Sequence, residues 1–556
     1  MKKRILSIAI AFGLIMSACT EYFEYDNNSL IKEELVYSDY NYMKQVLASA
    51  YTLLPSTFNR IDNGMLASAS DESEHAWDYS AVQRFNNGSW DAYSNPDDVW
   101  GRQYQLIRSA YVFLNGTDTV KFKQYQYVDD VTYNRYTLEL KQFRAQARFL
   151  IAYSYFELFK RYGGVPIVDH LLSVDENLNL PRNTAEEVVK FIVANCDSAI
   201  NVLPKVYDSG NTGRATLGAA MALKCRTYLY AASPLHNGGV YNTALCDSAA
   251  RIASAFIAPS GSLKSTYTLE GNYGNLFTRK HNSNEMIFER RDGNNNGYEK
   301  ANFPIGFDGS GGGATCPSQN LVDAYTMKNG KPITDPTSGY DAANPYNNRD
   351  PRLSYTVILN NTMFKGRTIE LWTGGLDGKG KDKASKTGYY LKKYVDDNLN
   401  LLQNNTSRHT WYYFRLGEIY LNYAEAMNEA FGPADNRYGL SAVEATDVIR
   451  KRGGIPNLVA AEFATAETLR ERIRNERRIE LAFEEHRSWD VRRWLIAEST
   501  LGEDLKGMDI TKNPDGTFVY TPYVVEKRTF SNKMNFYPIP NGEIIKQKNL
   551  VQNEGW

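Results

Sequence analysis

The chain has few of the residues that most often build catalytic or metal sites. Its 556 residues include only 5 cysteines and 6 histidines, the histidines are scattered, and no two cysteines form a CxxC pair. Neither the GxSxG pattern of α/β-hydrolases nor the HExxH pattern of zinc proteases occurs. These absences favour a protein that is not an enzyme and that has no metal site.

Charge and hydropathy exclude further classes of protein, and the cysteines bear on disulfides. The 63 basic and 64 acidic residues nearly cancel, so the chain lacks the basic excess that binds nucleic acid. Beyond the N-terminus, no stretch approaches the roughly 20 apolar residues of a membrane-spanning helix. Besides Cys19, the cysteines are Cys196, Cys225, Cys246 and Cys316. Cys196 and Cys225 fall on two helices predicted to be neighbours, so one disulfide is an alternative to the buried free thiols that we expect.

The N-terminus indicates export and anchoring. A basic start is followed by an apolar stretch over residues 5–15 and then by small residues before Cys19. This order is typical of a secretory signal, here residues 1–18, and the stretch is too short to span a bilayer. The cysteine resembles that of a bacterial lipobox, so we expect Cys19 to be acylated and residues 19–36 to form a lipidated tether. An ordinary secreted protein with a chance cysteine is the alternative.

Aromatic side chains and helical patterns dominate what remains. The 39 Tyr, 24 Phe and 8 Trp residues present flat faces that suit helix packing and sugar rings alike. Apolar residues recur every three or four positions, and Thr184 with Glu187 forms a capping box that begins a helix. The predicted helices cover residues 39–54, 97–114, 136–161, 184–202, 214–232, 241–256, 414–431, 441–451 and 465–484.

These helices are similar in length and separated by short turns, like stacked tetratricopeptide hairpins, so we predict a mainly α superhelical scaffold. Between them, glycine, asparagine and aspartate clusters replace helical periodicity, with brief strands at 285–290 and 353–359. Asn513-Pro-Asp-Gly516 predicts a hairpin. We expect one domain over residues 37–556, with a helical part (37–256), a loop-rich ligand-facing part (257–410) and a second helical part (411–556).

Six segments in order resemble one known family. They include FLIAYSYFELFKRYGGVP at 149–166, RLGEIYLNYAEA at 415–426 and RNERRIELAFEEHR at 474–487. The others lie at residues 213–234, 348–352 and 535–540. Together they resemble the SusD/RagB family of outer-membrane nutrient-binding lipoproteins of Bacteroidetes.

The resemblance implies a fold, a location and a partner. Members are largely α-helical, with four tetratricopeptide-like units and a variable loop-rich face. They sit on the cell surface as a lid over a SusC-like TonB-dependent porin and bind oligosaccharides, sometimes peptides, for import. The acidic residues after Cys19 resemble the surface-export signal of such lipoproteins. We therefore expect a lipid-anchored protein of the outer membrane that faces the exterior.

The charged segment at 472–480 is interpreted as scaffold. Arg472 and Glu476 lie four residues apart, and Arg477 and Glu480 three apart, so each pair is expected to meet along the surface of a helix. His486 suggests acid–base chemistry only superficially, because a single histidine among arginines more readily ends one helix and begins the next.

Ligand contacts in such a family come from aromatic faces and planar polar groups on the variable face, and three segments carry that mixture. The first cluster of candidates consists of Asp71, Trp77, Tyr79, Arg84, Asn87 and Trp90. A second consists of Tyr298, Phe307 and Asp308, next to the glycine run at 309–313, which we interpret as a flexible loop. Trp372 is a third candidate wall, and the lysines at 379, 381, 383 and 386 are interpreted as a solvated loop.

A calcium site is a weaker hypothesis. Asp292, Asn294 and Asn296 match the opening of an EF-hand loop, but the twelfth position is Phe303, where a bidentate glutamate is required. An Asn/Gly-rich turn is therefore the default, and no cofactor is expected.

Three functions are compatible with these features. The first is a non-enzymatic surface lipoprotein that captures oligosaccharide for a TonB-dependent porin. The second is the same architecture capturing peptides. The third is a surface glycoside hydrolase on a helical scaffold, because a pair of catalytic carboxylates is set by three-dimensional distance rather than by sequence spacing.

Overall fold

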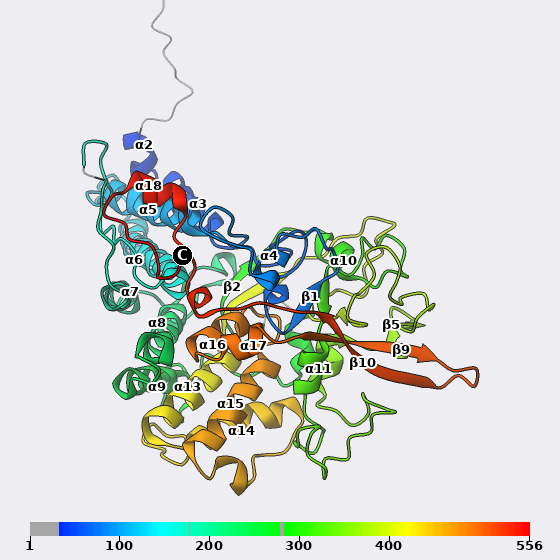
Figure 1. Ribbon diagram of the computed structural model, residues 1–556. Helices are drawn as coiled ribbons and strands as arrows, with labels where there is room; N and C mark the ends of the chain where they lie inside the picture. Colours follow the sequence, from blue (N-terminus) through cyan, green and yellow to red (C-terminus); the bar gives the residue numbers. More distant parts are fainter. Residues whose placement is uncertain (1–32, 177, 279–282) are drawn as a thin grey trace, which may run out of the picture.

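The computed structural model describes residues 33–176, 178–278 and 283–556. Helices fill one side of the molecule in Figure 1, whereas loops and short strands fill the other. In the described part of the chain, no helix is long and apolar enough to cross a membrane. The expected signal and Cys19 lie outside the described residues.

The N-terminal helices form a stack in which each helix contacts the next. Helix α5 packs on α6, α6 on α7, α7 on α8, and α8 on α9. The predicted capping box is present, since Thr184 accepts from the backbone N–H of Glu187 and Glu187 accepts from that of Thr184. The bounds are α2 (Glu33–Ser38), α3 (Tyr40–Thr52), α4 (Gln83–Asn87), α5 (Trp100–Gly116), α6 (Asp130–Tyr162), α7 (Ala185–Ile200), α8 (Leu217–Ala232) and α9 (Thr243–Ile257).

The C-terminal helices continue this stack. Helix α13 packs on α9 and also contacts α14 and α15, so the two helical parts share one body. The bounds are α10 (Gly297–Asn302), α11 (Gln319–Ala324), α12 (Arg352–Thr356), α13 (Leu416–Phe431), α14 (Ala442–Gly453), α15 (Ala466–Glu480), α16 (Arg487–Arg493), α17 (Ala497–Leu501) and α18 (Asn541–Lys546).

The strands of the described residues form antiparallel two-stranded pairs. They are β1 (Ser73–His75) with β3 (Thr315–Pro317), β2 (Met286–Arg291) with β8 (Thr410–Arg415), β4 (Val357–Ile358) with β7 (Tyr390–Leu391), β5 (Met363–Phe364) with β6 (Arg367–Thr368), and β9 (Leu505–Lys512) with β10 (Phe518–Glu526). The β9–β10 pair is the predicted hairpin, and it projects from the body on the loop-rich side (Figure 1).

Two predicted elements differ from the structure. Residues 353–356 of the strand expected at 353–359 belong instead to α12, because the Asp350 carboxylate accepts from the backbone N–H of Arg352 and folds the chain into a turn at the start of this helix. Helix α15 ends at Glu480 rather than at 484. The chain turns there through Phe483 and Glu485, whose φ angles of 60° lie in the left-handed region.

Three of the four residues in the predicted surface pairs of α15 lie inside the protein, namely Glu476, Arg477 and Glu480, so the predicted pairs are wrong. Glu476 lies 2.5 Å from Arg352, and Arg472 instead pairs with Glu462 at 3.2 Å. The Glu480 carboxylate contacts Arg415 at 2.7 Å. Sequence spacing suggested surface pairs because it does not show that α13 and residues 349–352 cover this face of the helix. The segment nevertheless belongs to the scaffold.

Arg415 is the centre of this buried network. Its guanidinium contacts Glu285 at 2.8 Å, and Glu480 and Glu484 each at 2.7 Å. Lys393 reaches the same Glu484 at 2.7 Å. All five side chains are almost completely buried. The network joins the end of β8, the C-terminal end of α15 and the chain around Lys393, so it ties the loop-rich part to the helical body.

Buried ion pairs also set the acid limit of stability. Burial raises the pKa of Asp71, but Arg478 and Arg487 lower it more, to about 2 from the usual 3.8. A carboxyl with a depressed folded pKa stabilises the protein above its unfolded pKa and loses that contribution as pH falls through the folded value. As pH falls from about 4 to about 2, protonation of Asp71 is expected to lower the free energy of unfolding by on the order of 2 kcal/mol. Urea unfolding at a series of pH values measures this loss. In Asp71→Asn, the free energy of unfolding should depend less on pH over the same range. An unchanged pH dependence in that variant would contradict the assignment.

The thiols are free. The structure contains four buried cysteines that form no disulfide: Cys196, Cys225, Cys246 and Cys316. Burial raises the pKa of each thiol, to about 11 for Cys316, so these cysteines are unreactive core residues.

Candidate ligand-binding groove

A turn after strand β1 presents two aromatic rings to solvent. Pairing of β1 with β3 continues as the N–H of Ala76 donates to the carbonyl of Ala314. The chain then turns, with the N–H of Ser80 donating to the carbonyl of Trp77. The Asp62 carboxylate holds this turn by accepting from the hydroxyl of Ser80 and the N–H of Ala81. The side chains at 77 and 79 therefore point the same way out of a fixed turn.

Trp77 and Tyr79 form a shared platform. Their ring centroids lie 5.5 Å apart with an interplanar angle of 22°, so the two faces are nearly parallel. Tyr79 is 73% exposed and Trp77 is partly exposed. Stacked, nearly parallel rings of this kind hold each other in place and present their outer apolar faces, which suit the C–H face of a sugar ring.

The loop at 379–386 and strand β10 complete a groove beside this platform. The groove has a volume of about 580 Å³ and is lined by residues 76–79, residues 379–386, Tyr523 and Val525. Lys383 places its ammonium 5.7 Å from the centre of the Trp77 ring. Lys386 pairs with Asp78 and Lys379 pairs with Asp509, so these lysines fasten the loop to both walls. We call this space the Trp77 groove.

The glycine run supports this loop instead of acting as a free arm. The N–H of Gly313 donates to the carbonyl of Lys383. Gly312 has a φ of 106°, and a Cβ added there would lie 2.4 Å from the Cβ of Lys383. Only glycine allows this close approach, so the run positions Lys383 at the groove.

The carboxylates of the groove are few. Asp78 and Asp382 are the acidic residues in its lining, and Asp78 is paired with Lys386. In the described residues no group of three or more His, Cys, Asp or Glu side chains is placed to hold a metal ion. The groove therefore offers aromatic faces, ammonium donors and hydroxyls to a ligand.

Of the sequence-predicted site residues, only Trp77 and Tyr79 line the Trp77 groove. Asp71 lies outside the groove, where its buried carboxylate is occupied by Arg478 at 2.5 Å and Arg487 at 2.8 Å. Arg84 is exposed outside the groove and donates to the hydroxyl of Ser94.

Two of the predicted aromatic contacts, Trp90 and Tyr298, are core residues and lie outside the groove. Trp90 is 2% exposed and packs on Tyr537 and Trp556, with ring centroids 5.0 and 4.6 Å away. Tyr298 is 1% exposed, and its hydroxyl donates to the carbonyl of Lys393. Asn87 is exposed, but its side chain accepts from the N–H of Ser89 in the turn after α4.

The remaining predicted residues lie outside the groove. Phe307 is partly buried under Arg367, whose guanidinium carbon is 3.9 Å from the ring centre, and Asp308 beside it is exposed. Trp372 packs on Phe518 of the hairpin at 5.3 Å, with Lys512 at 4.4 Å. Neither set lines the groove that holds Trp77.

Sequence reasoning misses the lysine loop and the hairpin wall. The lysines at 379–386 have the composition of a solvated loop, but the structure places them beside Trp77. Tyr523 of β10 does not stand out in the sequence, although its hydroxyl donates to the carbonyl of Lys386. The one available signal is that the chain has a glycine run at 309–313 and a lysine run at 379–386, since a glycine run allows another loop to approach closely.

The calcium hypothesis gains no support from the geometry. The Asp292 carboxylate accepts from Arg290 at 2.9 Å. The side-chain amide of Asn296 is buried and donates to Asn404 and Asn405. These two side chains fasten a turn, and Phe303 at the twelfth position is buried in the core.

Comparison with family models identifies the chain. One model, of the SusD family, matches residues 284–556. A second, described as starch-binding associating with outer membrane, matches residues 21–229. The chain belongs to the SusD family. The family is one of carbohydrate-binding, outer-membrane-associated proteins rather than of enzymes.

Known proteins share this SusD-family architecture over nearly the whole chain. A SusD-like protein of Bacteroides ovatus is 24% identical over 562 residues, which cover 97% of this chain and 92% of the relative. A SusD-like protein from Bacteroides fragilis has a crystal structure that matches with a TM-score of 0.79 at 26% identity, covering 95% of this chain and 99% of its own. A SusD-like carbohydrate-binding protein from the same species matches with a TM-score of 0.75 at 22% identity, covering 93% and 100%. The predicted mainly α, tetratricopeptide-like fold is confirmed.

Proposed function

We propose that this SusD-family protein captures oligosaccharide in the Trp77 groove at the cell surface. The paired faces of Trp77 and Tyr79 carry the proposal, because they form an exposed aromatic platform beside fixed hydrogen-bond donors. The family model described as starch-binding and the carbohydrate-binding protein from Bacteroides fragilis support a glycan as the ligand class. The proposal extends to a lipid anchor at Cys19 and to delivery of the glycan to a TonB-dependent porin.

Affinity electrophoresis tests capture directly. The full-length protein is run through gels that contain starch, laminarin or other neutral polysaccharides, with a peptide mixture and a reducing-end assay alongside. We expect one glycan class to retard the protein without release of reducing ends. Binding to peptides alone would support the second function, and release of reducing ends would support a hydrolase; either result would contradict the proposal.

Delivery has a separate test. The protein is purified from the native outer membrane under mild detergent, and its partners are identified by mass spectrometry. A TonB-dependent porin recovered in stoichiometric amount is the expected result. Recovery of the lipoprotein by itself under conditions that preserve other membrane complexes would contradict delivery.

A further inference from the structure

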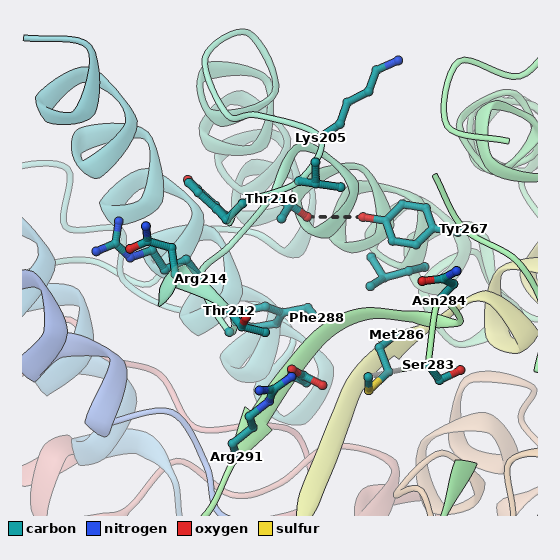
Figure 2. A pocket seen from close by; sticks show the side chains of 16 residues that line it. Lys205, Thr212, Arg214, Thr216, Tyr267, Ser283, Asn284, Met286, Phe288 and Arg291 are labelled. Atoms are coloured by element: carbon teal, nitrogen blue, oxygen red, sulfur yellow. Dashed lines mark hydrogen bonds and ion pairs between the residues drawn. The ribbon is translucent and has the colours of Figure 1, made fainter. Parts of the chain in front are cut away.

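A second cleft lies on the helical side of the molecule. Two cavities of about 240 Å³ and about 400 Å³ share the lining residues 212–214, Glu289 and Arg291. They open between α3, α6, the chain before α8 and strand β2. We call them together the Arg214 cleft, and their lining has no residue in common with the Trp77 groove. Figure 2 shows Arg214 and Arg291 in the lining of the first cavity, on different elements of the chain.

Arg214 forms no ion pair with a carboxylate of the described residues. Its guanidinium carbon lies 5.0 Å from the ring centre of Phe143 and 5.9 Å from that of Tyr207. Glu139, on α6, is bonded instead by the hydroxyl of Tyr40. Aromatic contacts fix the orientation of the planar guanidinium while leaving its N–H groups available, and such a fork binds carboxylates in a bidentate manner.

Glu289 provides a hydrogen-bond acceptor in the same cleft as the Arg214 donor. Its side chain is in the lining of both cavities, and the residue is only 7% exposed. One carboxylate oxygen accepts from Arg291 at 2.7 Å. The other, Oε2, is buried without a hydrogen-bond partner among the described residues. A buried acceptor left without a donor is costly, so a ligand hydroxyl that donates to Oε2 would be favoured.

The charge of the cleft decides between two ligand classes. Its lining contains five basic residues, Lys44, Lys205, Arg214, Arg290 and Arg291, and one acidic residue, Glu289. Asp292 neutralises Arg290 at 2.9 Å, and Glu289 neutralises Arg291, but a positive excess remains. This excess attracts a carboxylate and repels an ammonium group, so an anion that carries neutral hydroxyls fits better than a zwitterionic peptide end.

We propose that the Arg214 cleft is a second ligand site that binds the uronic-acid unit of an acidic saccharide. The sugar carboxylate binds the Arg214 guanidinium, and a ring hydroxyl donates to Glu289 Oε2. This site is independent of the Trp77 groove, so it stands or falls separately from the proposed capture of neutral glycan. It would give the protein a preference for glycans that contain acidic units.

Calorimetry with trigalacturonate tests this proposal on the full-length protein. The neutral trimer of galactose, the dipeptide glycylglycine and inorganic sulfate are titrated in parallel. We expect binding of trigalacturonate that Arg214→Gln weakens at least tenfold and Arg214→Lys weakens less, because lysine keeps the charge without the planar fork. Glu289→Gln should weaken binding of trigalacturonate while leaving that of sulfate unchanged.

Two control variants separate binding in the Arg214 cleft from a general charge effect and from binding in the Trp77 groove. Arg251→Gln removes one positive charge from an exposed position on α9 and should leave trigalacturonate affinity unchanged. Trp77→Ala should also leave it unchanged, although the Trp77 groove is disrupted. The proposal is wrong if Arg214→Gln binds trigalacturonate as tightly as the unaltered protein, if sulfate or the dipeptide binds equally well, or if trigalacturonate does not bind at all. Thermal unfolding of each variant confirms that it is folded.

Discussion

Replacing Trp77 with alanine is expected to weaken binding of the captured neutral oligosaccharide by a factor of about 30 or more. Truncating an aromatic anchor at the centre of a binding site costs about 2 kcal/mol or more, which corresponds to that factor. Trp77 supplies the more sheltered half of the platform with Tyr79, and Lys383 lies over its ring. Calorimetric titration of the variant with the glycan identified by electrophoresis measures the loss.

Trp372 offers a matched control. It is also a partly exposed tryptophan of the loop-rich side, but it packs on Phe518 away from the groove. Trp372→Ala should therefore leave affinity within about twofold of the unaltered protein. Equal losses in the two variants would show that the groove has been assigned to the wrong tryptophan.

Arg415→Met is expected to lower the free energy of unfolding by about 3–5 kcal/mol, because it breaks three buried ion pairs at once. Here three carboxylates lose the same cation, those of Glu285, Glu480 and Glu484. Each carboxylate then keeps only its other cations: Arg452 for Glu285, Arg452 and Arg352 for Glu480, and Lys393 for Glu484. Methionine approximates the length of the side chain and adds no polar group, so the measured loss reports the broken ion pairs. Unfolding in guanidinium chloride, followed by tryptophan fluorescence, gives the value.

An exposed ion pair provides the comparison. Lys190 on α7 pairs with Glu186 at 2.6 Å, and both side chains are more than two-thirds exposed. Pairs of this kind contribute little because water and salt screen them. Lys190→Met should unfold at the same denaturant concentration as the unaltered protein. Similar midpoints for Arg415→Met and Lys190→Met would contradict a structural role for the buried network.

The helical scaffold could be predicted from the sequence because its signals are local. Three- and four-residue spacing and the Thr184–Glu187 box act within a few residues, and α7 begins where that box places it. The burial of α15 could not be predicted in this way. Glu476 and Glu480 have the spacing of surface pairs, but their partners include Arg352 and Arg415, which lie more than 60 residues away in the sequence.

The difference between local signals and long-range contacts also explains why only some of the candidate site residues line the groove. Trp77, Tyr79, Trp90 and Tyr298 are alike in the sequence as aromatic residues near polar ones, but only the first two face the groove. Trp90 is covered by the C-terminal Trp556, a contact that local composition cannot reveal. Lys383 could not be predicted because it reaches Trp77 only through the packing of two distant loops.

A crystal structure of the protein with its bound neutral oligosaccharide tests the central claim most directly. We expect a sugar ring to lie with its C–H face on Trp77 and Tyr79, and its hydroxyls to be within hydrogen-bond distance of the loop at 379–386. A sugar bound at Trp372 or at any other surface, with the Trp77 groove left to solvent, would contradict the assignment of this groove as the capture site.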